Sequence, residues 1–199
     1  MTSTYNKWDF DINHTETSWL TGRCEKVFTP EECREIIKIG ESELLKNAKI
    51  GNDEIRTTVR ESDIRFFFPE TENSWIFERL ETTILNVNNT LFNFELTGLH
   101  EGIQFTKYTA PTGHYDAHID RNNIGFPVRK LSMTLQLSDP KDYEGGELEL
   151  YTNLQYPELA PPEQGTAFFF NSLILHKVNP VTRGTRYSLV AWIAGPRFR

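Results

Sequence analysis

The chain has 199 residues and a formal net charge of −7, with 28 acidic against 21 basic residues. That acidic balance argues against nucleic-acid binding, which needs a basic surface to displace counterions. Neither a run of 18 apolar residues nor an apolar leader is present, which argues against a membrane span and against export. With only two cysteines, the chain is expected to be a single cytoplasmic domain over residues 1–199.

Two helices are predicted in the first hundred residues. The segment 29–48 opens with Thr29 as N-cap, Pro30 at N1 and Glu32 at N3, which is a capping-box arrangement. A second helix is predicted over about residues 72–92. The apolar residues expected to face inward are Ile36, Ile37, Ile39, Leu44 and Leu45 in the first helix, and Trp75, Phe77, Leu80, Ile84 and Leu85 in the second. Between the helices, residues 57–68 have the composition of a strand pair or an extended connection.

From about residue 101 the pattern changes to short segments rich in β-branched and aromatic residues, separated by Gly, Pro, Asp and Asn. The strands are predicted over GIQFTKY, RKLSMTLQLS, GELELYT, TAFFFNS and RYSLVAWIA. This series is typical of a sandwich, jelly roll or barrel. The fold class expected is therefore α+β and mainly β, with residues 1–100 as helical support and substrate-loop region and residues 101–199 as the β core.

The stretch HYDAHID, residues 114–120, contains His-x-Asp twice, as His114-Tyr-Asp116 and His118-Ile-Asp120. In a regular strand, residues two apart lie on the same face. All four side chains would then point the same way. Periodicity alone leaves both pairs open as metal ligands.

A further histidine strengthens the case for a metal site. His176 follows the hydrophobic run FFFNSLIL, which is expected to be buried, and Arg186 comes ten residues later. Two imidazoles and one carboxylate form the facial triad of non-haem Fe(II) oxygenases, which leaves open positions for a co-substrate and dioxygen. A buried guanidinium can hold a carboxylate through two hydrogen bonds. His-x-Asp followed by a distant His and an Arg therefore indicates an iron oxygenase.

These segments resemble the Fe(II)- and 2-oxoglutarate-dependent dioxygenases, specifically the prolyl 4-hydroxylase-like branch. The resemblance covers roughly residues 101–196 and consists, in order, of QFTKY ending at Tyr108, YDAHID, RKLSMTLQLSD, YEGGEL, FFF, LHKVNPVTRGTR ending at Arg186, and Trp192. Family members carry Tyr-x-x-His-x-Asp; Tyr115 lies three residues before His118, whereas Pro111 holds that place before His114. The resemblance thus selects His118, Asp120 and His176 as iron ligands.

The resemblance also implies a double-stranded β-helix (jelly roll) and a set of cofactors: Fe(II), 2-oxoglutarate, O2 and ascorbate as the reductant. By the same carry-over, Arg186 binds the C5 carboxylate of 2-oxoglutarate, and Tyr108, Gln136 and Trp192 line the co-substrate site. Relatives place a tyrosine where this chain has Gln136, so the second contact to that carboxylate stays open. The YEGGEL segment is read as a tight turn.

The implied reaction is hydroxylation of an unactivated C–H bond, coupled to conversion of 2-oxoglutarate to succinate and CO2. The expected substrate is a prolyl residue in a protein or peptide, with Arg60 and Tyr115 contacting it. The alternatives are a hydroxylase of a free amino acid or other small molecule, and a non-enzymatic cupin-like metal-binding module. A nucleic-acid demethylase is disfavoured, because those relatives have a second Arg six residues after the first, where this chain has Trp192.

Overall fold

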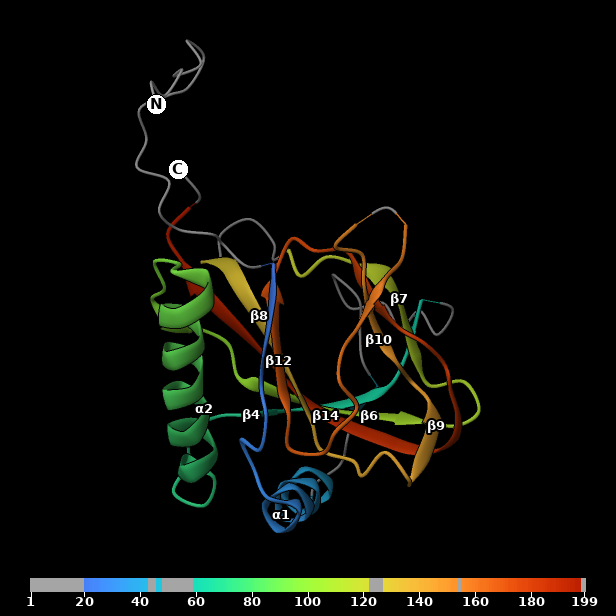
Figure 1. The fold of residues 1–199 in the computed structure, drawn as a ribbon. Helices are drawn as coiled ribbons and strands as arrows, with labels where there is room; N and C mark the ends of the chain where they lie inside the picture. Colours follow the sequence, from blue (N-terminus) through green and yellow to red (C-terminus); the bar gives the residue numbers. More distant parts are fainter. Residues whose placement is uncertain (1–19, 43–45, 48–58, 122–126, 154, 198–199) are drawn as a thin grey trace, which may run out of the picture.

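Figure 1 shows the computed structural model of the chain, which describes residues 20–42, 46–47, 59–121, 127–153 and 155–197. Its helices are α1 (Pro30–Glu41), α2 (Ser74–Val87) and the short π-helix η1 (Asn88–Phe92). Its strands before residue 120 are β1 (Thr21–Cys24), β2 (Lys46–Asn47), β3 (Arg60–Glu61), β4 (Asp63–Phe67), β5 (Gly98–Leu99), β6 (Ile103–Thr109) and β7 (His114–His118). The later strands are β8 (Val128–Gln136), β9 (Tyr143–Gly145), β10 (Leu148–Leu150), β11 (Glu158–Leu159), β12 (Ala167–Asn171), β13 (His176–Val178) and β14 (Val181–Gly195).

The strands form two antiparallel sheets. The larger has the order β1-β12-β8-β14-β6-β4-β2, with β5 and β9 also paired to β14, and the smaller has the order β11-β10-β13-β7-β3. Neighbours in each sheet are mostly distant in sequence, as in a jelly roll. The predicted mainly β fold with helices on the outside is confirmed, and the first hundred residues also contribute strands to both sheets.

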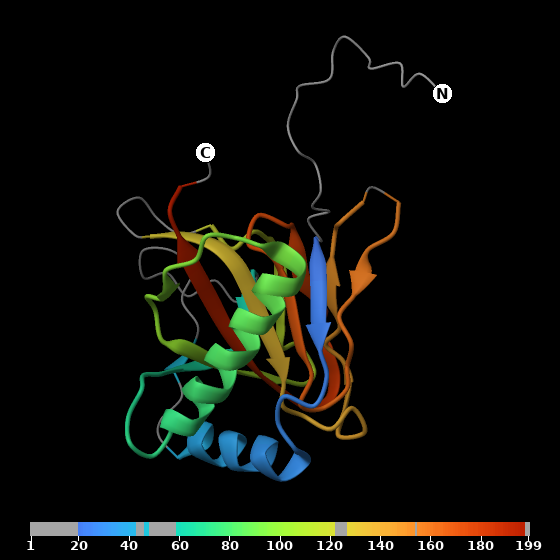
Figure 2. The same ribbon diagram turned by 60° about the vertical axis from the view of Figure 1, so that its left-hand side comes forward.

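The helices lie against one face of the larger sheet, with α2 running across it and α1 along its lower edge (Figures 1 and 2). The capping box at Thr29 and Glu32 is present as predicted. Helix α1 ends at Glu41. Leu44 and Leu45, which were predicted to face inward, lie outside the described residues. The inward position predicted for Leu85 is wrong: its side chain is exposed, and Ile76, Thr83 and Val87 are buried instead.

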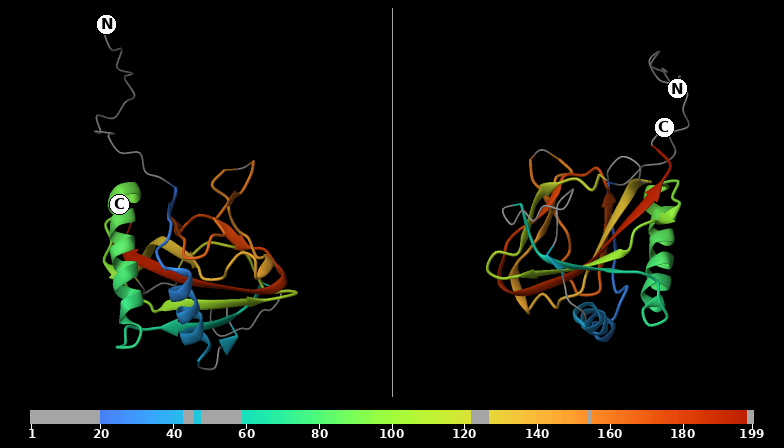
Figure 3. Two further views of the ribbon diagram at one scale, coloured as in Figure 1. Left: turned by 60° about the horizontal axis from the view of Figure 1, so that its bottom comes forward. Right: turned by 180° about the vertical axis from the view of Figure 1, so that it is seen from behind.

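Alternation along the larger sheet gives its two faces different chemistry. The outer face, under the helices, carries apolar residues such as Leu131, Met133, Phe169, Leu189 and Ile193, which join Ile36 and Leu80 of the helices in one core. The inner face faces the smaller sheet across the jelly roll (Figure 3) and carries the intervening residues. These include Tyr108, Ser132, Thr134, Gln136, Arg186 and Trp192, all of them except Thr134 buried.

The hydrophobic run FFFNSLIL is not one buried strand: it consists of the end of β12 followed by a turn. Strand β12 ends at Asn171, whose side-chain oxygen accepts a hydrogen bond from the backbone N–H of Leu173 at 2.9 Å and so closes a turn. Strand β13 starts only at His176. Leu173 and Leu175 are exposed, contrary to the prediction. No helix in the described ranges is long and apolar enough to cross a membrane.

A packing prediction follows from Gly40 in α1. A Cβ atom at this position would lie 2.5 Å from the ring of Phe105, which is fully buried in β6. Although alanine is intrinsically the better helix former, Gly40→Ala should lower the free energy of unfolding by about 1–2 kcal/mol, because the ring cannot move away without straining the core. Urea denaturation measures this change.

The control is Glu35→Ala on the exposed side of the same helix, where a change within about 0.5 kcal/mol is expected. A Gly40→Ala protein as stable as the parent would contradict the close packing of α1 on β6.

Candidate active site

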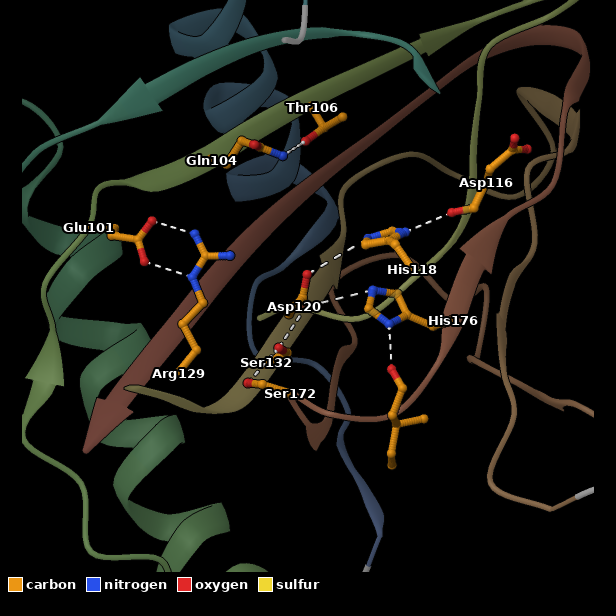
Figure 4. A network of polar contacts seen from close by, with 11 residues as sticks. Glu101, Gln104, Thr106, Asp116, His118, Asp120, Arg129, Ser132, Ser172 and His176 are labelled. Carbon is orange, nitrogen blue, oxygen red and sulfur yellow. Dashed lines mark hydrogen bonds and ion pairs between the residues drawn. The ribbon is translucent and has the colours of Figure 1, made fainter. Parts of the chain in front are cut away.

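A bulge in β7 decides which of its side chains face the interior. His176 pairs with His118, and Val178 pairs with Tyr115, so β7 has one residue more than β13 between these two rungs. Tyr115 and His118 therefore lie together, with ring centroids 3.6 Å apart. Asp116 is exposed and points away from His176 (Figure 4). The expectation that alternation would align all four His-x-Asp side chains is wrong for this reason.

The structure brings His118, Asp120 and His176 together as the only cluster of three or more metal-ligating side chains found in the described part of the chain. Their ligand atoms all lie within 4.8 Å of one another. Nε2 of His118 is 3.7 Å from one oxygen of Asp120, and Nε2 of His176 is 3.6 Å from the other. The carboxylate thus lies beside both imidazoles, whose ring centroids are 4.3 Å apart (Figure 4).

Backbone carbonyl groups fix the tautomer of both histidines. Nδ1 of His118 lies 2.7 Å from the carbonyl oxygen of Asp116, and Nδ1 of His176 lies 2.8 Å from that of Ile174. Since a carbonyl can only accept, each Nδ1 carries the hydrogen, and each Nε2 offers its lone pair toward Asp120. This arrangement orients both rings as metal ligands.

Two serines hold the carboxylate of Asp120 in place. Ser132 on β8 donates a hydrogen bond of 2.7 Å to Oδ2 of Asp120, and its hydroxyl also lies 2.9 Å from that of Ser172. The backbone N–H of Asp120 donates to the carbonyl of Ser172 at 2.9 Å. Asp120 is buried, so these bonds position a charge that is shielded from water. Sequence patterns did not identify either serine, although Ser132 lies on a predicted strand.

Burial, followed by the neighbouring His176, lowers the pKa of the His118 imidazole to about 4. His118 is therefore neutral at pH 7. A neutral imidazole with a free Nε2 is the form that binds a metal ion. The residues present thus fit a divalent iron ion in donor type and arrangement, with two imidazoles and one carboxylate close together.

On the His118 side, three groups are stacked in a column. The guanidinium carbon of Arg60 lies 4.5 Å from the centre of the Tyr115 ring, and Tyr115 stacks on His118. Nε of Arg60 donates to the hydroxyl of Ser62 at 2.8 Å. Strand β3, which carries Arg60, pairs directly with β7. The structure thus places both residues predicted to contact substrate beside the metal centre.

On the opposite side, Trp192 lies across the sheet from Ser132 and shares its face. Its indole is buried. Among the described residues, its Nε1 is the one buried side-chain nitrogen or oxygen atom without a hydrogen-bond partner. Arg129 stacks on the ring at 3.8 Å and is itself held by an ion pair with Glu101 (Figure 4). The Glu101–Arg129 pair was not anticipated from the sequence.

A cavity of about 380 Å³ lies on the inner face of the larger sheet, two residues along β8 and β12 from Ser132 and Phe170. None of the three metal-ligand candidates is among its lining residues. Arg186, Gln136 and Tyr143 line it, together with Thr134 and Phe168, which lie on the same strands as Ser132 and Asn171. Arg186 is buried, and no carboxylate of the described residues forms an ion pair with it. A buried cation without an anion is costly, so this cavity suits an anionic ligand.

The remaining predicted residues fall into two groups. Tyr108 is buried on the inner face, and the guanidinium carbon of Arg186 lies 5.7 Å from the centre of its ring. His114 and Asp116 lie on the rim, 3.8 Å apart, and no third ligating side chain of the described part joins them. The YEGGEL segment forms the turn between β9 and β10, as predicted, with Gly145 and Gly146 at positive φ.

Comparison with known proteins agrees with this geometry. The model of the 2OG-Fe(II) oxygenase superfamily matches residues 103–194. A PKHD-type hydroxylase from Pseudomonas fluorescens is 46% identical over 91 residues, which cover 43% of this chain and 39% of the relative. The chain spans only between 39% and 60% of the length of such curated relatives.

Two solved structures share the fold. A Pseudomonas putida prolyl-4-hydroxylase is 22% identical with a TM-score of 0.69, covering 89% of this chain and 94% of that one. A prolyl hydroxylase from Trichoplax adhaerens, in complex with a hypoxia inducible factor peptide fragment, is 19% identical with a TM-score of 0.74, covering 88% and 83%. Residues 103–194 thus match the 2OG-Fe(II) oxygenase superfamily, and the fold is like that of the prolyl 4-hydroxylases.

The two His-x-Asp pairs can be separated experimentally. We expect His118→Ala to abolish tight binding of Fe(II) or of Co(II) as a spectroscopic substitute, because it removes one of three ligands. His114→Ala should bind the metal like the parent, since His114 faces the rim. Calorimetric titration of both variants checks this, and the reverse result would contradict the assignment.

The serine that orients Asp120 should also affect metal affinity. Ser132→Ala leaves all three ligands in place but removes the donor to Oδ2, so metal affinity should fall about tenfold, as is typical of such outer contacts. The control is Ser138→Ala. Ser138 lies just after the end of β8, and its hydroxyl bonds to the backbone of β14 and not to Asp120. Unchanged affinity in Ser132→Ala would show that Asp120 is held without this bond.

Proposed function

We propose that the chain is an Fe(II)- and 2-oxoglutarate-dependent dioxygenase that hydroxylates a prolyl residue in a protein or peptide and releases succinate and CO2. In this proposal residues 1–199 act as one domain, and ascorbate serves as reductant. One observation carries it: the buried Arg186, without an ion-pair partner in the described residues, lines a cavity on the same inner face of the sheet as Ser132, which bonds to Asp120 of the His-Asp-His cluster.

The spacing of these groups suits a small dicarboxylate. Ser132, which holds Asp120, and Gln136, which lies beside Arg186 in the cavity lining, are four residues apart on β8, a rise of roughly 13 Å. An extended Arg186 side chain is long enough to cover part of that distance. A 2-oxo dicarboxylate can then be held by metal at one end and by Arg186 at the other.

Within this scheme the chain's own residues bind, orient and exclude water, while the metal and the co-substrate supply the oxidising chemistry. His118, Asp120 and His176 would hold the metal through two imidazoles and one carboxylate. Trp192 and Phe170 keep the interior around the metal-ligand cluster apolar. The ring of Phe170 lies 4.7 Å from that of His176. A closed apolar surround limits side reactions of the oxidant.

A prolyl substrate is supported by the likeness of the fold to prolyl hydroxylases. Exposed apolar residues, Ile119 and Leu175, also precede two of the metal-ligand candidates in sequence. Arg60 and Tyr115 then contact the peptide from β3 and β7 of the smaller sheet, and the Nη groups of Arg60 have no hydrogen-bond partner in the contacts described. The peptide-bound Trichoplax relative is consistent with this choice.

The decisive experiment measures succinate formation by the purified protein with Fe(II), ascorbate and 2-oxoglutarate, with and without proline-containing peptides. We expect peptide-stimulated succinate and a product heavier by one oxygen atom. Asp120→Ala should abolish both. Succinate that is stimulated only by free amino acids would replace the peptide with a small-molecule substrate, and no turnover in the parent protein under any condition would contradict the oxygenase proposal.

In the same assay Arg60→Ala should lower peptide hydroxylation more than it lowers succinate formation without peptide. Metal affinity of this variant is the control, because Arg60 also packs on Tyr115 beside His118. Unchanged peptide hydroxylation would exclude Arg60 from substrate contact.

A further inference from the structure

We propose that Tyr143 is a second hydrogen-bond donor to the distal carboxylate of the 2-oxo acid co-substrate, and that Gln136 orients Tyr143 instead of binding the co-substrate directly. The inference rests on the proposed function and assigns the contact that the glutamine at position 136 left open. Tyr143 lies on β9, away from the strand where relatives place their tyrosine.

The hydrogen bonds of Gln136 leave it little to offer a carboxylate. Its Nε2 donates to the hydroxyl oxygen of Tyr143 at 3.0 Å and, at 3.4 Å, to the backbone carbonyl of Ser138. A carbonyl can only accept, so the nitrogen side of the amide must face Ser138, which also settles its orientation toward Tyr143. With both N–H groups engaged, the remaining amide oxygen would repel an anion.

The same contact determines what the tyrosine can do. The phenol oxygen of Tyr143 already accepts from Gln136, so its own hydrogen must be donated elsewhere. Within the described residues no acceptor for that hydrogen is found, although the side chain is buried. Since Tyr143 lines the cavity, a bound carboxylate is the partner that its geometry provides for.

Gly146 brings Tyr143 and Arg186 to the same place. A Cβ atom built on Gly146 would lie 3.0 Å from Cδ of Arg186 and 3.7 Å from Cε2 of Tyr143, so both side chains flank this one glycine. Gly146 also has a positive φ of 69°, which disfavours other residues. The Cβ atom would also lie 2.8 Å from Cγ2 of Val181, so only a glycine lets Arg186 and Tyr143 pack this closely at the cavity wall.

The charges around the cavity favour a second donor. Glu144 and Glu147 belong to the same lining, and Glu144 pairs outward with Arg183 at 2.9 Å. A carboxylate that enters past these groups binds to Arg186 against their repulsion. A neutral hydroxyl donor beside Arg186 adds a charge-assisted hydrogen bond and adds no charge to the protein.

The test uses ligand binding under anaerobic conditions, so that turnover is not required. The full-length protein loaded with Fe(II) is titrated with 2-oxoglutarate and with 2-oxobutyrate, a 2-oxo acid that lacks the distal carboxylate, and the charge-transfer absorption of the chelate is followed. Tyr143→Phe should raise the Kd for 2-oxoglutarate about tenfold, at the lower end of what a hydrogen bond to a charged group contributes. The Kd for 2-oxobutyrate should not change.

Three further variants interpret the result. Tyr151→Phe, which removes a hydroxyl bonded to Glu149 on an exposed tyrosine, should leave both Kd values unchanged. Arg186→Met should remove the preference for 2-oxoglutarate altogether. Gln136→Leu should weaken 2-oxoglutarate binding in the parent but add nothing in the Tyr143→Phe background, because it acts through Tyr143.

Each outcome decides between the assignments. If Tyr143→Phe binds 2-oxoglutarate like the parent, the tyrosine is not a donor. If Gln136→Leu weakens binding equally in both backgrounds, Gln136 binds the co-substrate itself and the orienting role is wrong. If the parent protein does not chelate 2-oxoglutarate at all, the proposed function fails and this inference fails with it.

Discussion

Two-residue alternation along β8 and β14 is the constraint on which the rest of the molecule depends. Each strand must be apolar on the side that meets α1 and α2, since those helices have no other core to bury their apolar faces in. The side chains in between are then free to be polar, and they all face the interior of the jelly roll. Ser132, Gln136 and Arg186 are buried polar groups that would be misplaced in an ordinary core. The stability of the outer layer thus supports a chemically specialised inner one.

The sequence allowed much of this to be predicted, for identifiable reasons. The capping box at Thr29 is a local hydrogen-bond pattern, and the strands from residue 101 follow from composition and period. Selecting His118 over His114 needed the family motif, because periodicity treats the pairs alike. The physical basis of that selection is the bulge in β7, which depends on pairing with β13 and has no signature in HYDAHID itself.

What escaped prediction depends on contacts between distant segments. Leu173 and Leu175 look like core residues in sequence, but the side chain of Asn171 turns the chain and exposes them. Leu85 lies on the boundary of the buried face of α2, where a small error in helix phase changes the expected side. Ser172 lies outside any motif and reaches Asp120 only when β12 meets β8. Tyr143 was read only as part of the YEGGEL turn, and its contact with Gln136 depends on the pairing of β9 with β14.

Strand β14 has a consequence for how such a pocket can change over time. It is 15 residues long and pairs with β5, β6, β8 and β9, so Arg186 and Trp192 are carried by a single continuous strand held on both sides. The distance along the strand from Arg186 to Trp192, which pairs with Ser132, is therefore set by covalent geometry, at roughly 20 Å of rise over six residues. Insertions in the surrounding loops can occur without altering that length. Under the proposed function, the substrate can therefore diversify while the co-substrate site keeps its size.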